Sequence, residues 1–241
     1  MQHSTRGIVL HQVNYSESSI VAKIYTELFG LQSYIINSVR GKKSKFKSNI
    51  FQPLSLVEMI VYHKENRGLQ RLSEIRCNPQ LNNISSDIRK SSITIFLNEV
   101  LIKVLKEEEH DQSLFDFLFH AIQILDLTTD SCSNFHLQFL VSLSRFAGFY
   151  PLGTYNESDR YFDMMEGKFV PLVSGHPHVI SDPYCKAFYN LTISSFKKNE
   201  EIKINHYERK ILLTALLDYY RLHISNFGII RSQHILEEVL A

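Results

Sequence analysis

The sequence predicts an α+β protein in two parts: a small barrel of five β-strands, followed by a domain of α-helices that contains a small hairpin. Three observations support this prediction. Before Pro79 the apolar residues alternate along short runs, after it they recur at helical spacing, and the two parts differ in charge. We therefore expect a strand-rich domain over residues 1–80 and a helical domain over residues 81–241, in which residues 150–185 form the hairpin excursion.

Five runs rich in β-branched and aromatic residues predict the strands of the first part. In the second run Ile20, Ala22 and Ile24 alternate with Lys23 and Tyr25, which gives the strand one apolar and one polar face. A five-stranded barrel that closes on itself is the OB architecture, although an SH3-like barrel would give much the same pattern. The expected strands cover residues 6–15, 19–27, 31–39, 54–63 and 69–76.

In the second part, apolar residues repeat at three- and four-residue spacing, which predicts helices. Ser86 or Asp87 can cap the first of them, and Asp182-Pro183 can begin the fourth, because proline fits the first helical turn. Residues 161–164 and 168–171 flank Met165-Glu166-Gly167 and predict the hairpin. The expected helices cover residues 88–109, 112–127, 134–146, 183–194, 207–224 and 232–240.

Composition excludes several classes of protein. Hydrophobic residues make up 44% of the 241 residues and the formal net charge is +1, which excludes a disordered polyelectrolyte. No apolar run approaches the ~20 residues of a membrane span, and the first residues lack the apolar stretch of a signal peptide. The three cysteines are too few for a disulfide framework, so we expect a cytoplasmic protein.

Positive charge is concentrated in the first part. Residues 1–80 carry a net charge of +6 and the remainder a net charge of −5. The strongest local signal lies at residues 40–48, where five basic residues and one phenylalanine occur without an acid, in an expected loop. Basic side chains can follow a phosphate backbone, and aromatic rings can stack on bases. We expect a sequence-tolerant DNA site formed by Arg40, Lys42, Lys43, Lys45, Lys47 and Phe46, with help from Lys23, Arg67, Arg71, Tyr25 and Tyr34. A solubilising loop, or a loop that binds an acidic protein, would have the same composition.

The remaining chemistry-bearing residues do not form a recognisable active site. His176, His178, Asp182 and Cys185 are of metal-binding types, but they lack the paired spacing of a metal site. The sequence has no paired-cysteine motif, nucleophile elbow or phosphate-binding glycine loop. We therefore expect no catalytic residue, no cofactor and no metal; the alternative is a metal-dependent hydrolase built on His176, His178 and Asp182.

Five segments of the first part occur in the order and spacing typical of the bacterial recombination mediator RecO family. They are Gly7-Ile8-Val9-Leu10, Tyr15-Ser16-Glu17-Ser18-Ser19, Tyr25-Thr26-Glu27-Leu28-Phe29-Gly30, Val39-Arg40-Gly41-Lys42-Lys43-Ser44-Lys45 and Gln52-Pro53-Leu54-Ser55-Leu56. Two later segments resemble a helix and a C-terminal turn of the same family: Phe135-His136-Leu137-Gln138-Phe139-Leu140, which precedes Gly148, and Phe227-Gly228-Ile229-Ile230-Arg231-Ser232. Each motif is short, but the ordered set is fairly specific and covers nearly the whole chain.

The resemblance implies an OB-fold domain and a helical domain that together bind single- and double-stranded DNA and anneal complementary strands. It also implies that the protein works with RecR to load the RecA recombinase onto strands coated by single-strand DNA-binding protein, at the bacterial nucleoid and without enzymatic activity. The acidic tail of that coating protein would need an apolar pocket beside a cation. The candidates are Arg145 with Phe146, and Arg231 with Ile230.

One departure from the family concerns the segment 150–185. Many members hold a four-cysteine zinc module after the helix that resembles residues 135–140, whereas here only Cys185 remains. Tyr155, Tyr161, Met164 and Met165 occupy the stretch where paired cysteines would stand. We therefore expect a metal-free hairpin that is held together by apolar packing.

Overall fold

The computed structural model describes residues 1–37, 48–65, 67–106, 110–129, 132–172, 175–196 and 202–241. Contacts between these residues divide the chain into two compact units. Residues 1–87 and 97–126 form the barrel unit, and residues 88–96 and 127–241 form the helical unit. The contacts thus group residues 97–126 with the strands, and the predicted domain boundary after residue 80 stays a prediction.

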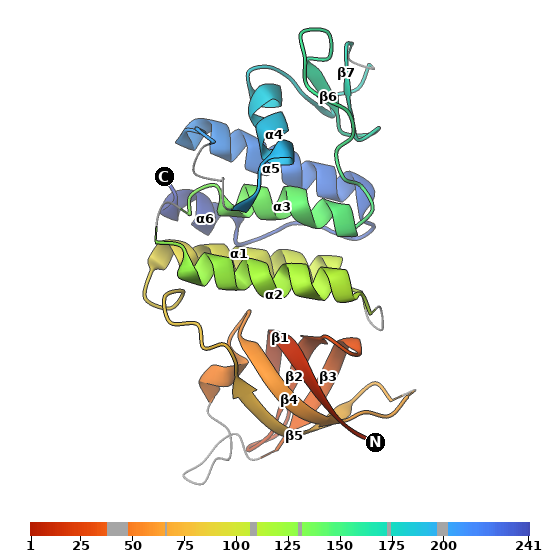
Figure 1. Cartoon of the computed structure of the whole chain (residues 1–241), viewed down its shortest axis with the longest axis vertical. Helices are drawn as coiled ribbons and strands as arrows, with labels where there is room; N and C mark the ends of the chain where they lie inside the picture. The colour runs from red at the N-terminus through yellow and green to blue at the C-terminus, as the bar shows by residue number, and fades with distance from the viewer. Residues whose placement is uncertain (38–47, 66, 107–109, 130–131, 173–174, 197–201) are drawn as a thin grey trace. The chain divides into compact units, whose positions relative to one another are not determined.

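The strands of the barrel unit close into a barrel, labelled β1 to β5 in Figure 1. Neighbouring strands follow the order β1-β2-β3-β5-β4, with β4 pairing back onto β1, and only β3 and β5 are parallel. This closure confirms the predicted five-stranded, OB-like barrel. The strands are β1 (Gln2–Asn14), β2 (Ile20–Thr26), β3 (Gly30–Ile36), β4 (Leu56–Tyr62) and β5 (Gln70–Cys77), with a short 3-10 helix, η1 (Ser48–Phe51), before β4.

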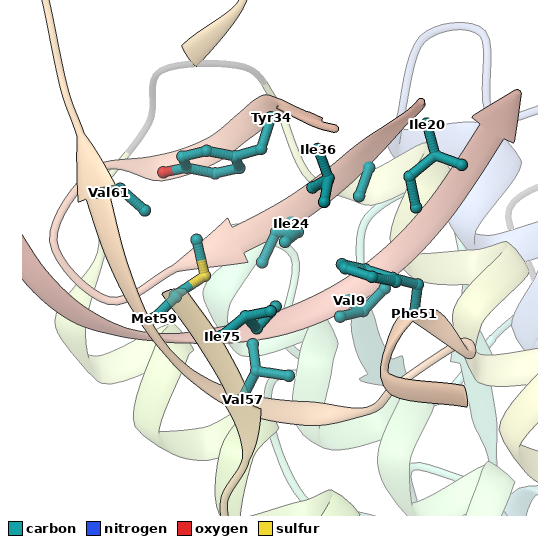
Figure 2. Packing of buried hydrophobic residues seen from close by; sticks show 11 residues of the cluster. Val9, Ile20, Ile24, Tyr34, Ile36, Phe51, Val57, Met59, Val61 and Ile75 are labelled. Carbon is teal, nitrogen blue, oxygen red and sulfur yellow. The ribbon is translucent and has the colours of Figure 1, made fainter. Parts of the chain in front are cut away.

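The barrel interior is filled by alternate residues of the strands, as the period of two requires. Ile20, Ala22 and Ile24 of β2 all belong to this core, as their alternation in the sequence predicts. Figure 2 shows Ile20 and Ile24 among the other core side chains. Gly7 of β1 is closely packed: a Cβ atom there would stand 2.7 Å from Cγ2 of Ile24. Glycine is therefore required at this position by close packing.

Arg6 holds the helix α2 (Gln112–Leu127) against the outside of the barrel. Its guanidinium donates to the two carboxylate oxygens of Glu27 at 2.7 and 2.8 Å, and to Asp116 of α2 at 3.3 Å. The same group lies 4.9 Å from the ring centroid of Phe119 and 5.3 Å from that of Phe115, both on α2. A bidentate ion pair and two aromatic contacts therefore meet at one side chain.

A buried carboxylate fixes the connection from β5 to the helix α1 (Ile88–Val104). Asp126, near the end of α2, accepts hydrogen bonds from the backbone amides of Asn82, Asn83 and Ile84 at 3.2, 2.8 and 2.9 Å. Asp126 is only 4% exposed, so these three amides satisfy a charge that would be costly to bury alone. The connection is thereby ordered although it has no regular secondary structure.

The helical unit contains the remaining helices, which lie close to the positions predicted from the apolar spacing. Its longest helix begins with a capping box, in which Asn205 and Glu208 each accept from the other's backbone amide. Two tyrosine hydroxyls of that helix are buried and donate to backbone carbonyls, Tyr219 to Phe149 at 2.6 Å and Tyr220 to Leu140 at 2.7 Å. The helices are α3 (Phe135–Phe146), α4 (Tyr184–Ile193), α5 (His206–His223) and α6 (Gln233–Val239). Within the described ranges, every helix is too short or too polar to span a lipid bilayer.

The predicted hairpin is present as β6 (Tyr161–Asp163) and β7 (Lys168–Val170), and a third strand, β8 (Val179–Ile180), pairs with β6. The sequence does not predict β8, because two residues are too few for a periodic pattern. Phe162 of β6 is fully buried, with ring centroids 4.7 Å from Phe188, 5.1 Å from Phe169 and 5.4 Å from Tyr219. Aromatic packing therefore forms the core of this small sheet.

This core yields a stability prediction. Phe162→Ala should lower the free energy of unfolding by about 3–5 kcal/mol, because it removes the ring on which three others pack. Thermal unfolding followed by circular dichroism would measure the loss, and Phe162→Leu should cost less because it keeps most of the apolar volume. A chelator should leave the wild-type melting temperature unchanged. A melting temperature that falls with chelator, or zinc above trace level in the purified protein, would contradict a sheet held by aromatic packing alone.

A second prediction concerns the pH dependence of stability. The Arg6 guanidinium and the Gln112 amide donate to the Glu27 carboxylate, and they lower its pKa in the folded protein despite partial burial. The stabilisation is therefore complete above the unfolded pKa of about 4.3 and is lost as the pH falls through the lower folded value. Below about pH 5 the melting temperature of the wild type should fall more steeply than that of Glu27→Gln. Parallel curves for the two proteins would show that the pair contributes nothing to stability.

Candidate nucleic-acid interface

The segment with the strongest sequence signal lies outside the described residues. Arg40, Lys42, Lys43, Lys45, Phe46 and Lys47 all fall within residues 38–47. The residues on either side of this segment are described: Asn37 directly follows β3, and η1 begins at Ser48. The segment therefore starts and finishes at the barrel, and its cations are covalently tied to β3.

The strand register assembles an outer barrel surface beside β3. One continuous row of paired positions crosses the barrel, from Val13 of β1 through Val21, Ile35 and Arg71 to Tyr62 of β4. Because directly paired residues point to the same side of a sheet, these side chains share the outer face. Val13, Arg71 and Tyr62 of this row are exposed. Apolar, cationic and aromatic side chains thus meet on one surface.

All three predicted assisting cations lie on this outer face or at its edge. Lys23 is half-buried on β2, where it pairs with His11 of β1 and Ser33 of β3. Arg71 is an exposed residue near the start of β5. Arg67 is also exposed and lies in the connection that leads into that strand. The structure therefore brings Lys23 and Arg71 onto one side of the barrel wall, with Arg67 at its edge.

Two predicted stacking residues are wrong, because both rings are buried. Tyr34 is 0% exposed and belongs to the barrel core, where Figure 2 shows its ring close to Val61. Burial raises the pKa of its hydroxyl far above the ordinary value. Tyr25 points away from the core, but it is covered by α2, with its ring centroid 6.1 Å from that of Phe115. Neither tyrosine can stack on a base in this fold.

The exposed aromatic side chain of the outer row is Tyr62, which the sequence analysis did not select. It lies directly opposite Arg71 in the β4–β5 ladder and is 46% exposed. The alternation along β4 could have predicted this exposure. Val57, Met59 and Val61 point into the core, so the next residue, Tyr62, must point outward. A cation beside an exposed ring is suited to a phosphate and its neighbouring base.

The candidates for partner binding have mixed outcomes. Ile230 is 2% exposed and part of the core, so its predicted role beside Arg231 is wrong; the neighbouring Ile229 is 75% exposed instead. Arg231 is exposed. Arg145 is also exposed, and its guanidinium lies 4.4 Å from the ring centroid of Tyr150, while Phe146 is half-buried. Partner binding by Arg145, Phe146 and Arg231 stays a prediction.

The histidine-rich segment does not converge on one point. His176 contacts the buried Asp163 carboxylate, with Nε2 and Oδ2 3.2 Å apart, whereas Asp182 accepts a hydrogen bond from the Tyr155 hydroxyl at 2.9 Å. The described residues contain no group of three side chains positioned to hold a metal ion. Cys185 is fully buried, and this burial raises the pKa of its thiol to about 12. The segment therefore lacks the converging geometry that hydrolytic metal sites require.

Comparisons with known proteins match the whole chain. A family model described as "Recombination protein O N terminal" matches residues 1–79, and one described as "Recombination protein O C terminal" matches residues 85–229. The chain is similar to a protein named DNA repair protein RecO from Azobacteroides pseudotrichonymphae, with 35% identity over 239 residues. A protein of the same name from Bacteroides fragilis is 36% identical over 241 residues, and each alignment covers 99% of both chains. Another from Flavobacterium psychrophilum is 34% identical and covers 100% of both chains.

The corrected positions of the tyrosines give a prediction for oligonucleotide binding. Tyr62→Leu should weaken binding of a short oligothymidylate about fivefold or more, because a base–aromatic stack contributes about 1–3 kcal/mol. Tyr34→Phe should leave the affinity unchanged, since the ring stays in the core. Fluorescence anisotropy of a labelled oligonucleotide measures both constants. Equal affinities for Tyr62→Leu and wild type would remove the outer row from the interface.

Proposed function

Because the chain belongs to the recombination protein O family of DNA repair proteins, we propose that it is a recombination mediator that binds DNA without sequence preference and anneals complementary strands. Both single- and double-stranded DNA are its ligands, and charge rather than catalysis is its means of action. The observation that carries this proposal is the run Arg40–Lys47, five cations without an acid, attached to the end of a barrel strand.

Electrostatics explains why such a run gives tolerant binding. Lysine and arginine side chains neutralise phosphates and release condensed counterions, and the backbone presents the same charge whatever the sequence. Lys23 and Arg71 on the outer barrel face, with Arg67 at its edge, extend the positive surface beyond the segment. A strand held by this surface would be bound mainly through its backbone.

Annealing follows from the same interaction. Two complementary single strands repel each other through their phosphates, and this repulsion slows their encounter. A protein that neutralises part of the charge on both strands lowers that barrier while it leaves the base edges free to pair. No bond is broken or formed covalently, so the proposed activity needs no catalytic residue and no cofactor.

The proposal extends to protein partners. The mediator acts with RecR to place RecA on single strands at the nucleoid, and it recognises the acidic tail of the single-strand DNA-binding protein. Arg145 beside the half-buried Phe146, and Arg231 beside the exposed Ile229, offer a cation next to apolar surface in the helical unit. An acidic tail that ends in an apolar residue has the complementary chemistry.

The salt dependence of binding tests the role of the basic run. Five phosphate contacts predict a slope of about −3.5 in a plot of log affinity against log salt for single strands. Replacing Arg40, Lys42, Lys43, Lys45 and Lys47 with alanine should bring this slope close to the small value left by the remaining cations, and should slow annealing in parallel.

A charge-matched control separates local contacts from net charge. Alanine at five exposed cations elsewhere removes the same charge: Lys106, Arg160, Lys168, Lys186 and Lys203. This control should keep most of the wild-type slope. If the five-alanine variant of the basic run and the control behave alike, or if the wild type does not retard an oligonucleotide even at low salt, the basic run is not a DNA site. Retention of an acidic protein by the same run would then favour a protein adaptor.

A further inference from the structure

A hollow of about 380 Å³ opens in the barrel unit between the turn that joins β2 to β3 and the connection that joins β4 to β5. Its volume lies within the range of about 300–1,000 Å³ that is typical of small-molecule sites. The lining combines aromatic rings with charged and amide side chains, chiefly Leu28, Phe29, His63, Lys64, Arg67 and Gln70. Of these residues, the sequence analysis selected Arg67 alone.

Two rings that line the hollow form a parallel stack. Phe29 and His63 have ring centroids 4.0 Å apart and planes inclined by 8°, and His3 meets Phe29 edge-on at 5.3 Å. Both stacked rings are only partly buried. Burial, and then the nearby His3, lower the pKa of His63, which favours the uncharged form of the stacked ring. A flat heteroaromatic ligand could continue such a stack.

His63 lines the hollow, and its Nδ1 is buried without a hydrogen-bond partner in the described part of the chain. Leaving it unpaired has a free-energy cost. Because this atom is closed to the hollow, the polar contacts of a ligand would be made by the exposed side chains that line it. Glu65 also lines the hollow and can accept a hydrogen bond from an amino group.

Gln70 binds the backbone of both residues that supply cations to the hollow. Its buried side chain accepts from the Lys64 amide at 3.0 Å, and donates to the carbonyls of Lys64 and Arg67 at 2.8 and 2.7 Å. The Lys64 and Arg67 side chains are exposed and line the hollow together with the stacked rings.

We propose that this hollow is a base pocket, which takes one unstacked nucleobase next to the Phe29–His63 rings while Lys64 and Arg67 hold the adjoining phosphates. The pocket rests on the proposed DNA binding and adds to it a point at which a base, rather than the backbone, is held. Along the chain, the pocket and the basic run flank β3: Phe29 directly precedes this strand, and Arg40 follows it. The two sites together would grip one strand at two places.

A thermodynamic cycle tests the pocket by combining a change in the protein, Phe29→Leu, with a change in the ligand, the removal of its bases. Dissociation constants are measured by fluorescence anisotropy for wild type and Phe29→Leu, with a short oligothymidylate and with an abasic oligomer of the same length. Wild type should prefer the oligomer that carries bases, and Phe29→Leu should reduce this preference about fivefold or more, because the stack contributes about 1–3 kcal/mol. Affinity for the abasic oligomer should not change, since Lys64 and Arg67 remain. Tyr207→Leu, which removes an exposed ring in the helical unit, should keep the full preference.

A second measurement needs no variant. An oligonucleotide that contains 5-iododeoxyuridine, irradiated with the wild-type protein, should cross-link to a peptide that includes Phe29 or His63. If thymidine monophosphate suppresses this cross-link, the pocket also accepts a free nucleotide; if it does not, only a strand-borne base is held, and both results support the pocket. An unchanged base preference in Phe29→Leu, or cross-links found only elsewhere, overturns it. Such a result with normal DNA binding rejects the pocket alone, whereas a wild type that binds neither oligomer rejects the DNA function as well.

Discussion

The ion pair between Arg6 and Glu27 is the contact on which much of the barrel unit depends. Glu27 lies in the turn between β2 and β3. Two backbone amides of this turn donate to β1: the Glu27 amide to the Arg6 carbonyl, and the Leu28 amide to the Thr5 hydroxyl. Arg6 also reaches Asp116 and the rings of α2. One side chain therefore positions the helix that buries Tyr25 and the turn that presents Phe29. The position of α2 outside the barrel and that of the β2–β3 turn at its rim therefore both depend on the Arg6–Glu27 ion pair.

Much of this arrangement could be predicted from sequence, because local periodicity records which side of a strand or helix is buried. Ile20, Ala22 and Ile24 point inward as their alternation predicts. The same rule would have excluded Tyr34, which is in phase with Ile36, and would have selected Tyr62. Tyr25 is different: its outward direction was predicted correctly, but its burial depends on α2, which is ninety residues away in sequence. A contact of that kind leaves no trace in a local pattern.

The small sheet of the helical unit illustrates how aromatic packing can form the core of a very short sheet. Phe162 gathers Phe169, Phe188 and Tyr219 around it, in a segment that retains one cysteine. Aromatic rings bury large areas with few rotatable bonds, so a few of them can order three very short strands. The strand β8 and the precise ring contacts could not be predicted from sequence, since neither follows from composition. The hairpin and its apolar packing could be predicted, because Tyr161, Phe162 and Phe169 stand in two short runs on either side of Met165-Glu166-Gly167.

The closure of the barrel depends on an unusually short seam. β3 and β5 pair at only two positions, Tyr34 with Gln70 and Ile35 with Arg71, whereas every other ladder of the barrel has six or seven paired positions. If this seam parted, the other four ladders could remain intact, and the barrel would become an open sheet in the order β3-β2-β1-β4-β5. Both rims of that opening carry functional candidates, the basic run after β3 and Gln70 with its ordered connection before β5. The basic run thus follows, along the chain, the strand that forms the shortest ladder of the barrel.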